Sequence, residues 1–485
     1  MPATIEALRP FIIATLSAVL AIVASAHAIL NKRDVRAAAA WVGVIWLVPV
    51  LGSVLYALLG INRIRRRATE LRKLGVDISY LPRDTYTDWQ IVAAELSEPH
   101  GHLETLARVV GRVTGRPLLA GNRLVPLVNG DAAYPAMLEA IERADRSIAL
   151  CTYIFDHDEV GVEFSRALGQ AVSRGVAVRV LIDAVGARYS FPSPSIIGEL
   201  KSAGVPVARF MRTLWPWRMP FANLRSHRKV LVVDGMVGFT GGMNIRVGHV
   251  LARNPRRPVQ DLQFRVEGPI VEQLMQVFAE DWAFTTREVL QDDIWFPRLE
   301  HVGPVVARGI SDGPGLDLDK LRMTLLGAIA AARSKVTIVT PYFLPDRELI
   351  SALNIASMSG VDVRIVLPGV NNQPLVAWAA MAQHWQLLER DCRIFLTAPP
   401  FDHTKLMIVD DVWTLIGSAN WDPRSLRLNF EYNVECYDRG LAREMEQLTD
   451  NKLEGAQQLS QSAVDARSLP VKMRDGIARL LSPYM

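Results

Sequence analysis

The first sixty residues hold two long apolar runs without a formal charge, residues 10–30 and residues 37–60. At about 1.5 Å per residue, each run is long enough to cross a hydrocarbon core about 30 Å thick. We therefore expect two transmembrane helices within residues 1–62. Buried core helices are one alternative. A cleaved secretory signal is another, because residues 26–28 (Ala-His-Ala) resemble a cleavage site, although the second run would still anchor the chain.

Basic residues flank the second run on both sides. Three of them stand between the two runs: Lys32, Arg33 and Arg36. A denser group follows the second run: Arg63, Arg65, Arg66, Arg67, Arg72 and Lys73. Because basic residues favour the cytoplasmic side, the bias predicts a multi-pass protein with a cytoplasmic C-terminal part, although the three basic residues of the external loop oppose it. The denser group also suits an anionic membrane surface, and a stop-transfer signal explains it equally well.

The rest of the chain alternates helical and strand patterns, twice in the same order. In the first half, amphipathic stretches at 135–144 and 160–174 precede β-branched runs at 147–155 and 176–183. In the second half, stretches at 321–332 and 349–359 precede runs at 335–343 and 361–368. This alternation favours an α/β fold in which a mixed β-sheet carries helices on both faces. The repetition predicts two duplicated lobes packed together.

These patterns divide the chain into four segments. A two-span transmembrane hairpin covers residues 1–62, and a basic juxtamembrane linker with the entry to the first lobe covers residues 63–130. The first lobe then covers residues 131–305 and the second lobe covers residues 306–485.

Each lobe carries one copy of the motif H-x-K-x-x-x-x-D. Its residues are His227, Lys229 and Asp234 in the first copy and His403, Lys405 and Asp410 in the second. The chain has nine histidines, and only these two have Lys and Asp at these spacings. Each copy is followed by a turn of small residues that ends in asparagine, at Asn244 and at Asn420.

The motif pattern predicts a β-hairpin, because an apolar strand follows each lysine and a turn follows each aspartate. Residues i and i+2 of a strand share a face, so His227 and Lys229 should point the same way, as should His403 and Lys405. Each aspartate falls at the far end of the strand. We therefore expect Asp234 and Asp410 to anchor the turns rather than to act as bases.

Two histidines at one site suit displacement at phosphorus, because a neutral imidazole is a nucleophile and a protonated imidazole is an acid. Two lysine ammonium groups and two asparagine amides would stabilise charge on the phosphate oxygens without a metal or another cofactor. A single histidine in such a motif is usually structural. Two complete copies on a repeated lobe make coincidence a poor explanation.

Charge and cysteine content limit the kinds of partner and compartment to expect. The formal net charge is +4 over 485 residues, which gives little electrostatic reason to expect nucleic acid as a partner. The three cysteines lie in apolar surroundings without metal-ligand spacing, so we expect buried thiols in a reducing compartment.

At these residues the chain resembles the phospholipase D superfamily, whose members bring two HKD motifs to one active site. Within it the chain is similar to bacterial cardiolipin synthases nearly end to end. Besides the motifs, the resemblance rests on residues 56–60, 223–229, 340–346, 420–425 and 429–431.

The resemblance implies transfer of a phosphatidyl group from one phosphatidylglycerol to another, which gives cardiolipin and glycerol at a bacterial inner membrane. It implies His227 as the nucleophile and His403 as the acid and base, although the sequence is symmetric between them. It also implies that each histidine is oriented by a carboxylate downstream of the other motif. These carboxylates are Glu431 for His227 and Asp261 for His403. Lys229, Lys405, Asn244 and Asn420 would hold the phosphate.

Three rival functions stay open. A membrane-anchored phospholipase D would share the covalent intermediate and transfer the group to water, giving phosphatidic acid. A nuclease of the same superfamily is disfavoured by the two apolar runs and the low net charge. A scaffold without activity would be expected to have lost motif residues, whereas all six are present. The sequence makes no prediction of the oligomeric state.

Overall fold

The computed structural model describes residues 2–32, 35–60, 101–188, 195–211, 224–314 and 317–482. These residues form two compact units, an N-terminal one and a larger one that includes both motifs. The basic group at residues 63–73 lies outside the described residues.

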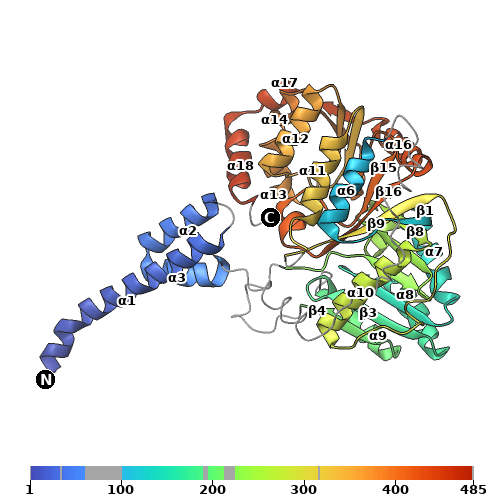
Figure 1. The fold of residues 1–485 in the computed structure, drawn as a ribbon, viewed down its shortest axis with the longest axis horizontal. Coiled ribbons are helices and arrows are strands. Elements are labelled where there is room, and N and C mark those ends of the chain that lie inside the picture. Colours follow the sequence, from blue (N-terminus) through green and yellow to red (C-terminus); the bar gives the residue numbers. More distant parts are fainter. Residues whose placement is uncertain are drawn as a thin grey trace. The chain divides into compact units, whose positions relative to one another are not determined.

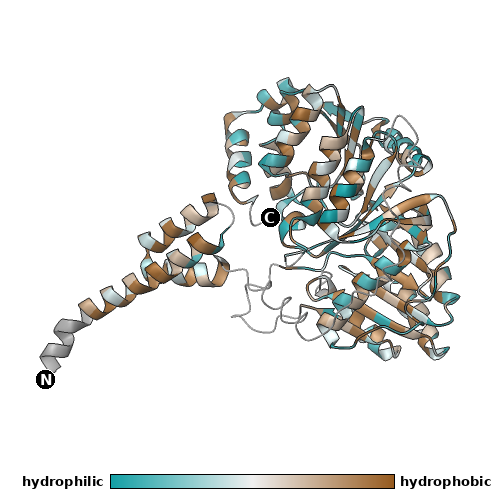
Figure 2. Cartoon of the chain, in the orientation of Figure 1, coloured by the Kyte–Doolittle hydropathy of each residue, from teal (hydrophilic) through white to brown (hydrophobic). Residues whose placement is uncertain are grey.

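The N-terminal unit consists of α1 (Pro2–Asn31), α2 (Val35–Leu47), α3 (Pro49–Leu55) and the π-helical turn η1 (Tyr56–Gly60). Most of its described residues are hydrophobic (Figure 2), and several large ones are exposed, among them Phe11, Leu30 and Leu47. Within α1, residues Phe11–Asn31 are long and apolar enough to cross a membrane, as predicted.

The prediction of a second continuous helix over residues 37–60 is wrong. The run is divided at Val48 into two shorter apolar pieces, Ala37–Leu47 and Pro49–Gly60. Proline explains the break, because Pro49 has no N–H to donate and its ring clashes with the carbonyl one turn earlier. The described part of the chain therefore holds a single helix of spanning length.

The larger unit is built on one mixed sheet of fifteen strands, as predicted for a mixed α/β fold. The strands of its first half are β1 (Leu119–Val128), β8 (Leu262–Glu267), β6 (Val237–Gly241), β5 (Val230–Val233), β2 (Ser147–Thr152), β3 (Ala177–Asp183) and β4 (Val207–Phe210), in spatial order. Those of its second half, from β1 outwards, are β9 (Val305–Asp312), β16 (Glu431–Tyr437), β15 (Trp413–Gly417), β14 (Leu406–Val409), β10 (Lys335–Val339), β11 (Asp362–Pro368), β12 (Arg393–Thr397) and β17 (Gln457–Leu459).

The two halves repeat the same pairing. In each, a parallel βαβ unit, β2–β3 or β10–β11, lies beside an antiparallel hairpin, β5–β6 or β14–β15. The halves join where β1 pairs antiparallel with β9. The repeat predicted from the sequence therefore appears as two halves of one continuous sheet.

The residues that begin and end the helices also recur in the two halves. Asp158 caps α8 (Glu159–Ser173) by accepting from the Gly161 N–H, and Asp346 caps α12 (Arg347–Met358) in the same way. Each helix is followed by a glycine with positive φ, Gly175 at 90° and Gly360 at 93°. These signals explain why the helix ends agree closely with the predicted ones.

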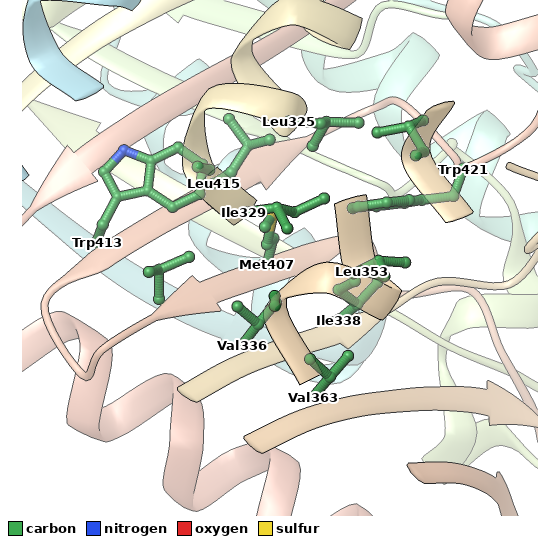
Figure 3. Packing of buried hydrophobic residues seen from close by; sticks show 14 of the residues in the cluster. Leu325, Ile329, Val336, Ile338, Leu353, Val363, Met407, Trp413, Leu415 and Trp421 are labelled. Carbon is green, nitrogen blue, oxygen red and sulfur yellow. The ribbon is translucent and has the colours of Figure 1, made fainter. Parts of the chain in front are cut away.

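Helices cover both faces of the sheet, as predicted (Figure 1). On one face lie α7 (Asn129–Glu142), α8 and α9 (Ile196–Ser202) in the first half and α6 (Leu103–Thr114), α11 (Lys320–Ala331) and α12 in the second. The other face buries α10 (Ile270–Thr286) and α16 (Arg439–Leu453) against strands of both halves. Figure 3 shows part of the second-half core, where Leu325 and Ile329 of α11 pack in one cluster with Met407 of β14 and Val336 and Ile338 of β10.

The end of the segment predicted as linker and lobe entry is structured. Here α6 packs into the second-half core, whereas β1 pairs with β8 of the first half. The chain thus crosses between the halves before the first lobe begins.

Candidate active site

Each motif begins just before a strand of a hairpin. His227 and Lys229 precede β5, and His403 and Lys405 precede β14. The two-residue spacing has the same consequence in both copies, because each lysine folds back onto its own histidine. Lys229 Nζ donates to the His227 carbonyl at 2.7 Å, and Lys405 Nζ donates to the His403 carbonyl.

The second half of the chain positions His227. Ser226 forms a β-bridge with Phe430, and the His227 N–H donates to the Phe430 carbonyl at 2.8 Å. The next residue, Glu431, therefore lies against the histidine ring, with its Oε2 3.0 Å from His227 Nδ1.

The first half positions His403 in the same manner. The short strands β7 (Val259–Gln260) and β13 (Phe401–Asp402) pair, and the His403 N–H donates to the Gln260 carbonyl at 2.7 Å. Asp261 follows, and its Oδ2 lies 2.7 Å from His403 Nδ1. Each half thus supplies the carboxylate that contacts the histidine of the other half. The structure brings His227 together with Glu431, and His403 together with Asp261.

Of the four basic side chains of the motifs, His227, Lys229 and Lys405 are buried and His403 is partly buried, and all four are close enough to affect one another. Burial lowers the pKa of His227, which nearby Lys229 and Lys405 lower further. Burial likewise holds the pKa of His403 well below its usual range, and Lys405, Lys229 and His227 add to this effect. Burial also lowers the pKa of Lys229 to about 7 and that of Lys405 to about 8. A bound anion would oppose all four shifts, so the site suits a phosphate group.

The two carboxylates have different environments. Burial raises the pKa of Asp261. Burial also acts to raise the pKa of Glu431, but the charge and hydrogen bond of His227 outweigh it, and the net shift is downward. Ser418 Oγ donates to Glu431 Oε2 at 2.5 Å and Asn429 Nδ2 donates to its Oε1 at 3.1 Å. At the place of Ser418 the first copy has Gly242, where a Cβ would lie 2.3 Å from Asp261 Oδ1.

Both predicted phosphate-binding asparagines are buried at the ends of the motif hairpins. Asn244 Oδ1 accepts from the Ile154 N–H at 3.0 Å, which holds the side-chain amide in place. Asn420 Nδ2 donates to Ser425 Oγ at 3.3 Å, and its Oδ1 has no hydrogen-bond partner among the described residues. Such a buried acceptor can be satisfied by a donor group of a ligand, such as a hydroxyl, and not by a phosphate oxygen.

The motif aspartates lie at the far ends of the hairpins. Asp234 accepts from three successive backbone N–H groups at 2.7 to 3.1 Å, those of residues 145, 146 and 147. Asp410 accepts from the N–H groups of residues 333, 334 and 335 and from His102 Nε2 at 2.7 Å. Both therefore hold the start of a neighbouring strand, in agreement with the expected anchoring.

Three further residues beside the histidines were missed by the sequence reasoning. The ring of Tyr153 lies 5.3 Å from that of His227, and the ring of Tyr342 lies 6.4 Å from that of His403. Both tyrosines belong to strand runs noted for their apolar pattern. His249 lies 6.4 Å from the His403 ring, and burial lowers its pKa to about 3. It lacks the motif spacing, so no sequence signal marked it.

The next question is whether side chains at the site could bind a metal ion. In the ranges that the structure describes, no three His, Cys, Asp or Glu side chains are arranged to hold a metal ion.

Similarity to known proteins covers both halves and the N-terminal unit. Residues 137–282 and 325–453 match the family described as cardiolipin synthase, PLD-like domain, and residues 19–60 match a phospholipase D-nuclease N-terminal family. Cardiolipin synthase A of Pseudomonas fluorescens is 32% identical over 96% of this chain and 96% of that protein. Cardiolipin synthase 1 of Bacillus anthracis is 31% identical over 94% of this chain and 90% of that protein.

A solved structure, the phosphatidylserine synthase of Haemophilus influenzae Rd KW20, shares the fold with a TM-score of 0.62 at 16% identity, over 78% of this chain and 100% of that one. Because the family's domain is matched in both halves and the relatives are similar along nearly the whole length, the chain belongs to the cardiolipin synthase family with phospholipase D-like domains.

Proposed function

We propose that this protein is a cardiolipin synthase, which joins two phosphatidylglycerol molecules into cardiolipin and releases glycerol. The observation that carries the proposal is the contact of each histidine Nδ1 with a buried carboxylate from the other half, Glu431 or Asp261. A carboxylate at Nδ1 holds the proton there, so that the Nε2 atom of the neutral ring is left as a base or nucleophile.

In the first step, His227 Nε2 attacks the phosphorus of the donor phosphatidylglycerol. A P–N bond forms, the P–O bond to the headgroup glycerol breaks, and His403 gives a proton to the leaving oxygen. The negative phosphate raises the pKa of His403, because it offsets the positive charges that lower it in the free enzyme. His403 can therefore hold the proton it must donate.

In the second step, the glycerol hydroxyl of another phosphatidylglycerol gives its proton to His403 and attacks the same phosphorus. The P–N bond breaks, His227 is restored and cardiolipin is formed. One phosphodiester replaces another, so the reaction needs no nucleotide. In both steps, the charges of Lys229 and Lys405 stabilise the phosphate oxygens.

The asymmetry of the carboxylates supports His227 as the nucleophile. Glu431 has a lowered pKa and accepts from Ser418 and Asn429, so it stays ionised beside His227. An ionised partner makes the imidazole more basic and stabilises the phosphorylated, cationic ring. Asp261 has a raised pKa and therefore holds its charge less firmly.

The substrate lipids and the apolar helix α1 suit a bacterial inner membrane, with the two lobes, residues 131–305 and 306–485, on the cytoplasmic side. Nucleic acid is not expected as a partner. The rival within the family is hydrolysis, in which water takes the place of the second lipid.

The test is the product that purified full-length protein forms from phosphatidylglycerol as the sole lipid. Cardiolipin with equimolar glycerol is expected, and it should be absent with His227→Ala or His403→Ala. His301→Ala, at an exposed histidine, is the matched control and should leave the rate unchanged. Phosphatidic acid as the main product would make the protein a hydrolase. Cardiolipin formation that survives loss of both histidines would refute the mechanism.

A further inference from the structure

The second apolar run folds back on itself. A Cβ on Gly52 would lie 2.4 Å from the Val44 carbonyl oxygen, which places α3 directly against α2. Nearer the ends of the run, the rings of Trp41 and Tyr56 lie 5.4 Å apart. These pairs lie on opposite sides of the break at Val48, so α2 and α3 with η1 form an antiparallel hairpin.

Both ends of this hairpin lie at the same end of α1. Tyr56 Oη is 2.8 Å from Nδ1 of His27, which stands in the last turns of α1. Val35 is also at that end, since it follows α1 by a short link. Figure 1 shows α2 and α3 side by side along the C-terminal part of α1. The chain therefore enters and leaves the hairpin at one level.

The hairpin is too short to cross a bilayer. Its arms, Ala37–Leu47 and Pro49–Gly60, reach about 16 to 18 Å at 1.5 Å per residue, against a hydrocarbon core of about 30 Å. The tip is nevertheless apolar and exposed: Leu47 is 83% exposed, Leu51 is 56% exposed and Val48 is 50% exposed. An apolar, exposed tip suits immersion in lipid rather than in water.

Part of the backbone at the turn is paired within the hairpin, although α3 has no side-chain cap. Pro49 brings no N–H to the tip, the Val48 N–H donates to the Val44 carbonyl at 3.1 Å, and the Gly52 N–H donates to the Val48 carbonyl at 2.6 Å. The buried residues Ala21 and Ala28 of α1 are small and let the hairpin pack closely against that helix.

From this geometry we propose that residues 35–60 form a re-entrant hairpin that dips into the cytoplasmic leaflet and returns, so that α1 alone crosses the membrane. Residues 2–10 then lie on the outer side. The basic residues at 32–36 and those at 63–73 lie on the same, cytoplasmic side. This arrangement removes the conflict with the positive-inside rule, because two spans would leave Lys32 and its neighbours outside.

The two topologies differ at both ends of α1, which makes them separable by cysteine labelling. Full-length protein with Ala3→Cys, Lys32→Cys or Gln458→Cys would be treated in intact spheroplasts with a membrane-impermeant maleimide, and again after permeabilisation. The native cysteines are buried, so the unsubstituted protein gives the background. Gln458 is exposed in the large unit and reports the cytoplasmic side under either topology.

We expect Ala3→Cys to be labelled in intact spheroplasts and the other two only after permeabilisation. Labelling of Lys32→Cys with protection of Ala3→Cys would establish two spans and overturn the proposal. Protection of both positions would also overturn it, because α1 would then not cross. The readout does not depend on catalysis, so it separates this proposal from the proposed function.

A matched glycine pair tests the fold-back itself. In the Lys32→Cys background, Gly52→Leu should open the hairpin and raise labelling from outside severalfold, since its side chain would overlap the Val44 backbone. Gly43→Leu adds the same volume where a Cβ meets no atom within 4 Å, and it should change nothing. Equal labelling of the two variants would refute the role given to the Gly52 contact.

Discussion

Replacement of Glu431 by glutamine should slow catalysis while preserving the shape of the site. Glu431 is fully buried and contacts His227 Nδ1 at 3.0 Å. The change removes a charge-assisted hydrogen bond worth about 1.5 to 3 kcal/mol. Because about 1.4 kcal/mol corresponds to a tenfold change in rate, we expect kcat/KM for cardiolipin formation to fall by about 10- to 150-fold.

The pH dependence distinguishes this effect from damage to the fold. Glu431 raises the pKa of His227, so its loss should lower that pKa further. The nucleophile must be neutral, and the rate of the unaltered enzyme falls as the pH drops through the pKa of His227. In Glu431→Gln, this acidic limb of the kcat/KM profile should move to lower pH.

The assay is glycerol release and cardiolipin formation from phosphatidylglycerol in detergent micelles, measured from pH 5 to pH 9 alongside thermal unfolding. Glu288→Gln is the control, since it removes a carboxylate that pairs with Arg179 elsewhere in the protein. More than half of the normal rate in Glu431→Gln, or an unmoved acidic limb, would refute the view that this carboxylate tunes His227.

Three further predictions concern stability and metal dependence. Asp234→Asn weakens the hydrogen bonds that the carboxylate accepts from backbone N–H groups, so it should lower the free energy of unfolding by about 1 to 3 kcal/mol. The rate per folded molecule should stay within about twofold, and a large loss of kcat would contradict the anchoring role. Burial lowers the pKa of His384 from 6.5 to about 4, so its neutral form stabilises the fold above pH 6.5 and that stability is lost as the pH falls towards 4. His384→Leu should therefore lose less stability between pH 7 and pH 4.5 in thermal unfolding, and an unchanged slope would exclude this histidine as a cause. A chelator should leave cardiolipin formation unchanged, because Lys229 and Lys405 supply the positive charge; a loss restored by added metal would contradict this.

Much of the larger unit followed from the sequence. Apolar periodicity is a local signal, and it located the repeated helices and strands at 135–183 and 321–368 to within a few residues, except that α7 begins six residues before the predicted stretch. The two motif copies identified His227, Lys229, His403 and Lys405 as a set, because their spacing recurs on a repeated pattern. The resemblance to a family added Asp261 and Glu431, whose positions carry no local signal.

Tertiary structure decided the partners of these elements. Periodicity predicts which face of an element is buried but not what covers that face. The sequence therefore did not predict that α6 packs into the core of the second half, or that α10 and α16 lie on the same face of the sheet. The contacts of Tyr153 and His249 with the motif histidines are likewise long-range, and only the folded chain brings them together.

The N-terminal unit shows the same division. Composition alone established that residues 10–30 and 37–60 are apolar enough for a membrane, and it gave them equal standing. The fold-back of the second run depends on a missing N–H at Pro49 and a missing side chain at Gly52, which permits backbone contact with Val44. Hydropathy measures how favourably each residue enters lipid, whereas the path of the chain is set by contacts between residues far apart along a helix.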